Sequence, residues 1–311
     1  MKSKMSSKTF ALCSIMSLSA GMSIAEAPQV AVDIAPVHSL VARVMEGVGT
    51  PNLIIPAGAS PHEYNLRPSE AASLQNADVV FWVSASLTPW MKNAIETLAE
   101  DAVVTELFEV EGTLKLPFRQ GVLFEEHDDH EAHDDHEGHN HDGDDPHAWL
   151  SPDNAAVWLN AIAQTLSKVD PDNASQYYLN AAAGQKELRE LSIKINGILA
   201  PFEGRNFIVF HDAYQYFEKA FDFYAAGAIS LSDARDPSPA RIAKIQNRIN
   251  EQNISCILSE PQFNPNIVAA VASGSDVKMG ILDPLGVGLE LGETLYFQTL
   301  HNLAKALSDC L

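Results

Sequence analysis

Basic residues are scarce in this chain of 311 residues: 20 Lys and Arg stand against 41 Asp and Glu, a formal net charge of −21. Nucleic acids and anionic membranes attract basic surfaces, so neither is expected as the main partner. The excess of negative charge favours a cation as partner, although it is also an ordinary route to solubility. With 46% hydrophobic and 20% charged residues, the chain still has the composition of a folded globular protein.

Long hydrophobic runs are missing after the first 27 residues, so no later segment is expected to span a bilayer. The beginning of the chain differs, because three lysines precede a mostly apolar stretch at 10–24 and Ala25-Glu26-Ala27 fits a small-x-small cleavage site. This order predicts a secretory signal peptide, residues 1–27, that is removed on export. Leu12 in front of Cys13 is bulkier than lipoprotein signals require, so we expect a periplasmic protein without a lipid anchor.

Cysteine is rare as well, and cleavage near Ala27 would leave only Cys256 and Cys310. An even number of cysteines in an exported protein predicts one disulfide, because the compartment is oxidising. Closing a loop of about 55 residues would stabilise the fold by roughly 4 kcal/mol through the entropy of the unfolded chain. Two buried free thiols are the alternative.

Short apolar segments alternate with segments of helical periodicity in both halves of the chain. The predicted strands cover 29–34, 52–55, 78–84, 103–108, 206–210, 223–228, 255–259 and 278–282. The predicted helices cover 37–47, 68–75, 89–99, 153–167, 171–199, 214–221, 239–250, 265–273 and a last segment from 293. Strands that alternate with helices at this spacing indicate βαβ units and parallel sheets.

The segment 171–199 stands out because it is rich in Ala, Leu, Glu and Lys and has almost no helix breakers. At about 1.5 Å per residue, one helix of this length would span the whole molecule. The expected fold is therefore α/β, with two Rossmann-like lobes built on parallel sheets, residues 28–165 and 201–311. A long linking helix within 166–200 would join the lobes, so that metal or ligand binding would tilt them only slightly.

Negative charge and histidine are concentrated in residues 125–145, which hold eleven acidic side chains, no Lys or Arg, and six of the eleven histidines. Such a segment cannot bury enough apolar surface to order itself, so we expect a mobile loop of the first lobe. Its imidazoles would bind zinc weakly at several sites, as a scavenger of metal or a sensor of sufficiency. An insertion with incidental affinity is the alternative. These histidines are His127, His130, His133, His136, His139 and His141.

Four other side chains lie at or near the ends of predicted strands. His62 follows the second strand, His211 and Asp283 end two strands of the second half, and His147 lies between the acidic segment and the next helix. Because open parallel sheets bind ligands outside the carboxyl ends of their strands, we expect these four residues to meet in the cleft between the lobes. Three imidazoles and one carboxylate suit a tetrahedral site for Zn²⁺.

Longer motifs lie around and between these residues. They are Ala35-Pro-Val-His-Ser-Leu40, Gly58-Ala-Ser-Pro-His62, Leu66-Arg-Pro-Ser69, Asn76-Ala-Asp78, His147-Ala-Trp-Leu-Ser-Pro152, Phe210-His-Asp212, Glu260-Pro-Gln-Phe263 and Asp283-Pro-Leu-Gly286. Together they resemble the zinc-binding, substrate-binding proteins of bacterial ABC-type metal uptake systems, a cluster that includes manganese-binding relatives. The resemblance covers essentially all of the mature chain, and the His-rich loop and the cysteine pair fit the zinc members.

The resemblance implies capture of Zn²⁺ with high affinity in the periplasm and its delivery to the membrane permease of an ABC zinc importer. A periplasmic metallochaperone is a further candidate partner, and the chain is expected to be a monomer. The implied metal ligands are His62, His147 and His211. Manganese relatives place Glu at the position of His211, and imidazole is the softer donor, so the resemblance favours zinc.

The fourth ligand is less defined. Asp283 occupies the position of the carboxylate ligand of the manganese relatives, while Pro61 stands where some zinc members carry an acidic residue. The resemblance therefore leaves Asp283 or water as the fourth ligand. Glu260, at the end of another predicted strand, is a candidate to hold the free ring nitrogen of a ligand histidine. Every ligand histidine must be neutral to bind, so affinity should fall below about pH 6.5.

Three other classes of protein could also use such residues. A zinc enzyme would keep an open coordination position with a general base, but no His-Glu-x-x-His run occurs and no Ser or Cys lies in a nucleophile motif, so no enzyme is expected. A manganese- or iron-binding protein of the same transporter class is one alternative. A zinc buffer whose His-rich loop is the main site is another.

Overall fold

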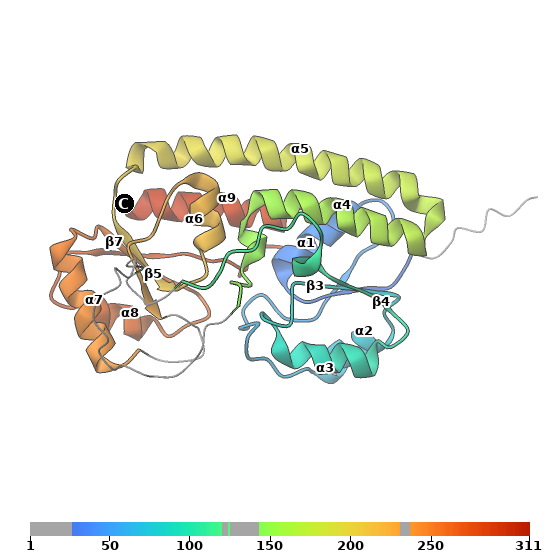
Figure 1. Cartoon of the computed structure of the whole chain (residues 1–311), viewed down its shortest axis with the longest axis horizontal. Coiled ribbons are helices and arrows are strands. Elements are labelled where there is room, and N and C mark those ends of the chain that lie inside the picture. The colour runs from blue at the N-terminus through green and yellow to red at the C-terminus, as the bar shows by residue number, and fades with distance from the viewer. Residues whose placement is uncertain (1–26, 120–123, 125–142, 231–236) are drawn as a thin grey trace, which may run out of the picture.

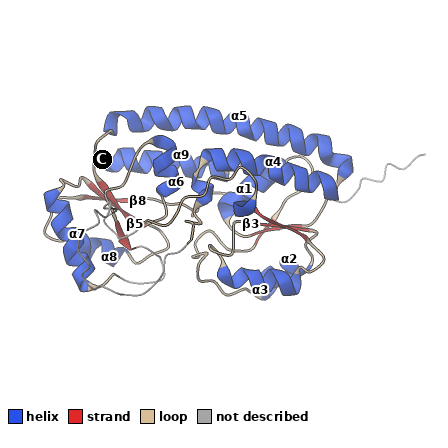
Figure 2. Cartoon of the chain, in the orientation of Figure 1, coloured by secondary structure: helices blue, strands red, loops and turns tan. Residues whose placement is uncertain are grey.

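A computed structural model of the chain describes residues 27–119, 124, 143–230 and 237–311. The predicted signal peptide, apart from Ala27, and the six loop histidines His127 to His141 lie outside these residues. Within them, the expected α/β fold is confirmed: two four-stranded parallel sheets are flanked by helices, and one long helix runs along both (Figures 1 and 2). No helix of the described segments is both long and apolar enough to cross a membrane.

The first lobe has the strand order β2-β1-β3-β4, and all of its strands are parallel. Its helices begin where the sequence supplies Pro at the first or second position, which is compatible with the unpaired N–H groups of a helix start. The elements are β1 (Val30–Val32), α1 (Ala35–Val44), β2 (Asn52–Leu53), α2 (Pro68–Gln75), β3 (Val79–Trp82), α3 (Pro89–Leu98), β4 (Val103–Glu106) and the 3-10 turn η1 (Leu107–Glu109).

The second lobe repeats this topology with the order β6-β5-β7-β8, again with parallel strands throughout. In both lobes the chain turns from one side of the first strand to the other, which creates the switch point where α/β sheets bind ligands. The elements are β5 (Phe207–His211), α6 (Gln215–Phe221), β6 (Ala228–Ser230), α7 (Pro239–Glu251), β7 (Cys256–Ser259), α8 (Pro265–Ala272), β8 (Lys278–Ile281) and α9 (Leu295–Cys310).

One predicted strand is misplaced. The apolar run at 223–228 was expected to form a strand, but the strand β6 begins only at Ala228. Asp222 takes a left-handed conformation (φ 50°) at the end of α6, and the N–H of Phe223 donates to the carbonyl of Glu218. Phe223 is buried because it stacks on Phe207, with ring centroids 5.5 Å apart, so its burial reflects the helix cap and not a strand.

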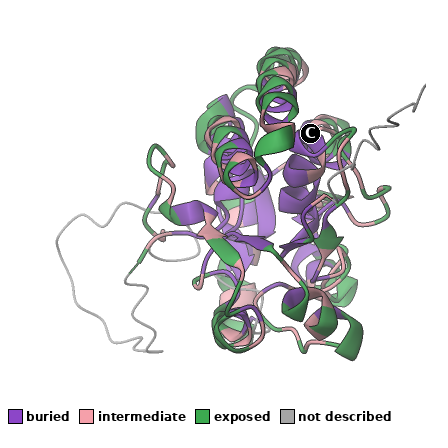
Figure 3. Ribbon diagram, turned by 90° about the vertical axis from the view of Figure 1, so that its right-hand side faces the viewer, coloured by how far each residue is buried: buried purple, intermediate pink, exposed green. Residues whose placement is uncertain are grey.

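Two antiparallel helices form the spine of the molecule (Figure 1). They are connected by a short 3-10 turn, and a second such turn leads into the second lobe. The elements are η2 (Ala148–Leu150), α4 (Pro152–Val169), η3 (Pro171–Asn173), α5 (Ala174–Leu199) and η4 (Ala200–Phe202). Figure 3 shows α5 at the top, with its buried side toward the molecule and its other side exposed; Tyr177, Gly184 and Leu188 lie on the buried side.

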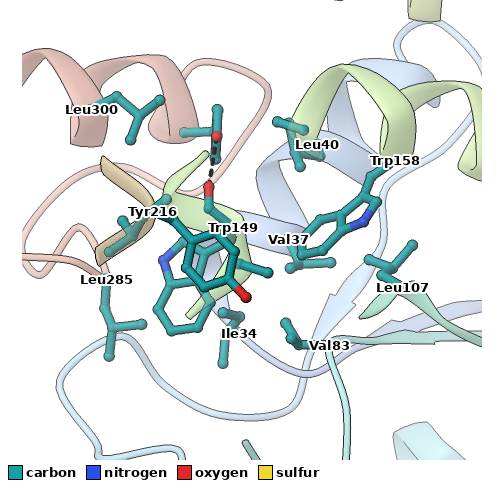
Figure 4. Packing of buried hydrophobic residues seen from close by; sticks show 14 of the residues in the cluster. Ile34, Val37, Leu40, Val83, Leu107, Trp149, Trp158, Tyr216, Leu285 and Leu300 are labelled. Atoms are coloured by element: carbon teal, nitrogen blue, oxygen red, sulfur yellow. Dashed lines mark hydrogen bonds between the residues drawn. The ribbon is translucent and has the colours of Figure 1, made fainter. Parts of the chain in front are cut away.

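The hydrophobic core continues from one lobe into the other. One cluster of buried side chains includes residues of both sheets and of the helices between them, while a smaller cluster lies within the second lobe. Figure 4 shows Trp149 of η2 within this core, together with Ile34 of the first lobe and Tyr216 and Leu285 of the second. Because interiors are close-packed, such a shared core resists a wide opening between the lobes.

The last helix is a second tie between the lobes. The N–H of Tyr296, near the start of α9, donates to Ser39 Oγ of α1 over 2.9 Å, and the Tyr296 hydroxyl donates to the carbonyl of Trp149. At its other end, Cys310 forms the predicted disulfide with Cys256 of β7, 54 residues away. The helix is thus held to the first lobe at one end and covalently to the second lobe at the other.

Candidate metal centre

Three of the four predicted ligands come together between the two sheets. His62 lies in the loop after β2, His147 directly precedes η2, and His211 is the last residue of β5. Among the described residues they form a group whose ligand atoms all lie within 4.8 Å of one another. They line a small, partly open cavity of about 20 Å³, which has room for at least one ion or water molecule.

Carboxylates hold two of the three rings. Asp145 Oδ1 lies 2.6 Å from Nδ1 of His147 and also accepts the backbone N–H of that histidine. Glu260, the residue predicted to hold a ring nitrogen, places Oε1 2.6 Å from Nδ1 of His211. All four side chains are buried. Because each carboxylate accepts a hydrogen bond from Nδ1–H, the two rings are held in the tautomer whose Nε2 lone pair can bind a metal.

These two lone pairs face the same point. Nε2 of His147 and Nε2 of His211 are 3.4 Å apart. Two nitrogens bound at about 2.0–2.1 Å to a tetrahedral zinc ion lie about 3.3 Å from each other. The two rings therefore already have the spacing that zinc requires, and the carboxylates of Asp145 and Glu260 would balance its two positive charges.

The third ring is the most exposed of the three. His62 is half-buried, whereas His147 and His211 are both 5% exposed. Its ring centroid lies 5.4 Å from that of His147. The indole N–H of Trp90 in α3 donates to the carbonyl of Pro61 over 2.9 Å, so the helix fixes the loop directly in front of the histidine.

Asp283 does not join this group. Its carboxylate accepts the backbone N–H groups of Leu285, Gly286 and Val287 over 3.0, 3.1 and 2.5 Å, so it caps the turn after β8. Burial raises the pKa of Asp283, and these three hydrogen bonds oppose that rise. Asp283 thus caps the turn, a common role of Asp before a tight turn, and its carboxylate is already hydrogen-bonded to the backbone.

A short backbone pairing of residues 116–118 with 143–145 positions His147, and Tyr216 of the second lobe contacts both segments. The N–H of Asp145 donates to the carbonyl of Leu116 over 2.7 Å, which joins the segments before and after the His-rich insertion. Tyr216 of α6 bridges both, since its hydroxyl donates to the carbonyl of Asp145 and accepts the N–H of Leu116. His147, a candidate ligand, is therefore positioned by contacts from both lobes.

A buried ion cluster lies beside this pairing. Arg119 donates to Asp212, the neighbour of the ligand His211, and to Glu218 of α6. Burial raises the pKa of Glu218 to about 7, and the guanidinium of Arg119 acts in the opposite direction. The guanidinium carbon also lies 3.6 Å from the ring centroid of Phe124. The cluster fastens the segment before the His-rich insertion to the second lobe.

Sequence analysis missed Asp145 and Arg119 as contributors to the site. The position of Asp145 two residues before His147 was a usable signal, because ligand histidines are commonly oriented by a carboxylate. Asp145 was instead counted with the charged loop. No local pattern connects Arg119 with Asp212 and Glu218, which lie 93 and 99 residues away.

Two parallel-sheet lobes with a three-histidine cluster between them define a two-lobed metal-binding protein. The family model described as ZnuA, zinc-uptake complex component A, periplasmic, matches residues 30–310. The chain belongs to this family. It is 41% identical to the high-affinity zinc uptake system protein ZnuA of Brucella abortus, over 94% of both chains. The protein of the same name from Paracoccus denitrificans is 40% identical, over 92% of this chain and 93% of the relative.

Solved structures share the fold. A crystal structure of ZnuA superposes with a TM-score of 0.75 at 22% identity, over 91% of this chain and 99% of the other. The periplasmic zinc-binding protein TroA of Treponema pallidum has a TM-score of 0.76 at 19% identity, over 91% and 98% of the two chains. At these identities the likeness concerns the fold alone.

Proposed function

We propose that this protein captures Zn²⁺ in the periplasm and delivers it to the permease of an ABC-type zinc importer. The observation that carries the proposal is the three-histidine cluster, in which Nε2 of His147 and Nε2 of His211 lie 3.4 Å apart and each of these two rings is held by a buried carboxylate. Relatives at about 40% identity are named high-affinity zinc uptake proteins. Export by a cleavable signal peptide and the absence of enzymatic activity belong to the same proposal.

Zinc is preferred over manganese because of the donor set. Imidazole nitrogens suit zinc, whereas Mn²⁺ is better served by carboxylate and water oxygens. With Asp283 engaged in its turn, no described carboxylate joins the histidine group. Competition between Zn²⁺ and Mn²⁺ for the full mature chain tests this, and tighter binding of Mn²⁺ would contradict the zinc assignment.

Release of the bound zinc involves a small local movement of the loop that carries His62. The lobes share one core, and α5 and α9 tie them together. The most exposed ligand, His62, lies on a loop and not on a strand. Its withdrawal would lower the coordination number without separating the lobes.

The zinc affinity of the mature protein is the decisive measurement, by competition with a chelator of known affinity. His211→Ala should weaken the tightest site at least 100-fold, because it removes one of three protein ligands. His301→Gln, on α9 away from the cluster, is the matched control and should keep the affinity. If His211→Ala keeps full affinity, while deletion of 126–142 abolishes tight binding, the protein is a buffer whose main site is the His-rich loop.

A further inference from the structure

Gln262 has a buried amide that makes no hydrogen bond to any of the described residues. It follows Glu260 and Pro261 after β7 and lines the cavity of the metal centre together with the three histidines. Both amide atoms, Oε1 and Nε2, are buried, and neither has a hydrogen-bond partner within the described part of the chain. An unpaired buried amide costs free energy, so buried polar groups nearly always have a partner.

The coordination number of zinc identifies this partner. Zinc takes four ligands in a tetrahedral site, and the histidines supply three. Asp283 is engaged by three backbone N–H groups, and Glu260 by His211. Among the described residues no further side chain is left for the fourth position, and we assign it to a small exogenous ligand. The other walls of the cavity are largely apolar, including Phe263 and Leu285.

We infer that Gln262 is a positioning residue for the fourth ligand: its amide hydrogen-bonds the water molecule that completes the coordination of the bound zinc. This inference rests on the proposed function. The amide oxygen accepts a hydrogen bond from the bound water, and the amide N–H₂ can donate one to an anion that replaces the water. A carboxylate at this position would keep the acceptor and lose the donor.

Two substitutions separate these roles. Gln262→Met keeps the length of the side chain and removes both hydrogen-bonding groups, so zinc should bind about threefold to tenfold more weakly, the range expected for one hydrogen bond. Gln262→Glu keeps an acceptor for the water, so zinc affinity should stay at or above the original value. The same carboxylate repels an anion at the fourth position.

Cobalt reports on the fourth ligand directly. One equivalent of Co²⁺ is added to the metal-free mature chain, and azide is titrated while the visible d–d bands are followed. Azide should bind at least threefold more weakly to Gln262→Met and at least tenfold more weakly to Gln262→Glu. A merely structural role of Gln262 would not separate zinc affinity from azide affinity in this way.

Gln298→Met is the matched control, because it makes the same change at an exposed position of α9 away from the cavity and should leave both affinities within twofold. His211→Ala tests the proposed function separately and should abolish the intense tetrahedral spectrum. If that spectrum is lost but both Gln262 variants bind azide as the original protein does, the inference is overturned and the zinc site stands. If Gln262→Met does not fold, unchanged azide binding by Gln262→Glu is sufficient to overturn it.

Discussion

The pairing of each buried ring with a carboxylate makes a quantitative prediction for zinc affinity. Glu260→Gln replaces the charged acceptor 2.6 Å from Nδ1 of His211 with a neutral one of the same shape. A hydrogen bond to a charged group contributes about 1.5–3 kcal/mol and a neutral one about 0.5–1.5 kcal/mol. The midpoints of these ranges differ by about 1.25 kcal/mol, which corresponds to a roughly tenfold weaker affinity for zinc. This lies at the lower end of the about 10- to 100-fold loss typical of such outer partners.

The same substitution should not weaken the metal-free fold. Glu260 is 3% exposed, and a buried charge is costly to desolvate, so a neutral amide is expected to leave the free energy of unfolding unchanged or higher. Zinc affinity is measured by chelator competition, and stability by urea unfolding in the presence of EDTA. Glu251→Gln, at the exposed end of α7, is the control.

Asp145→Asn should behave in the same way at His147, since Asp145 holds that ring as Glu260 holds His211. The two carboxylates contact different rings, so the free-energy losses should add and the double variant should bind zinc about 100-fold more weakly. Equal zinc affinity in the original protein and in both single variants would refute the reasoning, because the rings would then need no charged partner.

Three further predictions concern stability. Replacing Cys256 and Cys310 by Ser should lower the free energy of unfolding in urea by up to roughly 4 kcal/mol relative to the oxidised original protein, and equal stability of the two would contradict the prediction. Arg119→Met should destabilise the metal-free protein by about 3–5 kcal/mol, because two buried carboxylates lose their cation; a loss below about 1 kcal/mol in urea would show that the cluster is not needed. Burial raises the pKa of Asp33 from its usual 3.8 to about 7, so the unfolded carboxyl ionises first as the pH rises. The contribution of Asp33 to the free energy of unfolding is therefore most favourable below about pH 4 and falls by about 4 kcal/mol toward pH 7. Asp33→Asn should reduce this dependence of the unfolding free energy on pH, measured by urea unfolding at several pH values. An unchanged pH dependence would assign it to other groups.

Most of the fold could be predicted from sequence because its local signals are consistent. Buried strands such as Val79–Trp82 are short apolar runs, and five helices begin with Pro as their first residue. The prediction of a strand at 223–228 was wrong for a local reason. The apolar side chain of Phe223 is buried next to the left-handed cap of α6, and an apolar residue in the sequence does not show whether it is buried in a cap or in a strand.

The three histidines were predictable because topology, and not sequence proximity, places strand ends together. The rule that ligands bind at strand ends also pointed to Asp283, but it takes no account of hydrogen bonds within the turn that follows the strand. A strand-end carboxylate has two kinds of partner within reach, a metal or the backbone N–H groups of its own turn, and the turn Pro284-Leu285-Gly286-Val287 supplies three such donors. The rings of His147 and His211 pair instead with the carboxylates of Asp145, two residues earlier in the chain, and Glu260, 49 residues later. Strand-end position therefore located the three histidines around the cavity but did not reveal that the carboxylate of Asp283 caps its own turn, nor that Asp145 and Glu260 hold the rings.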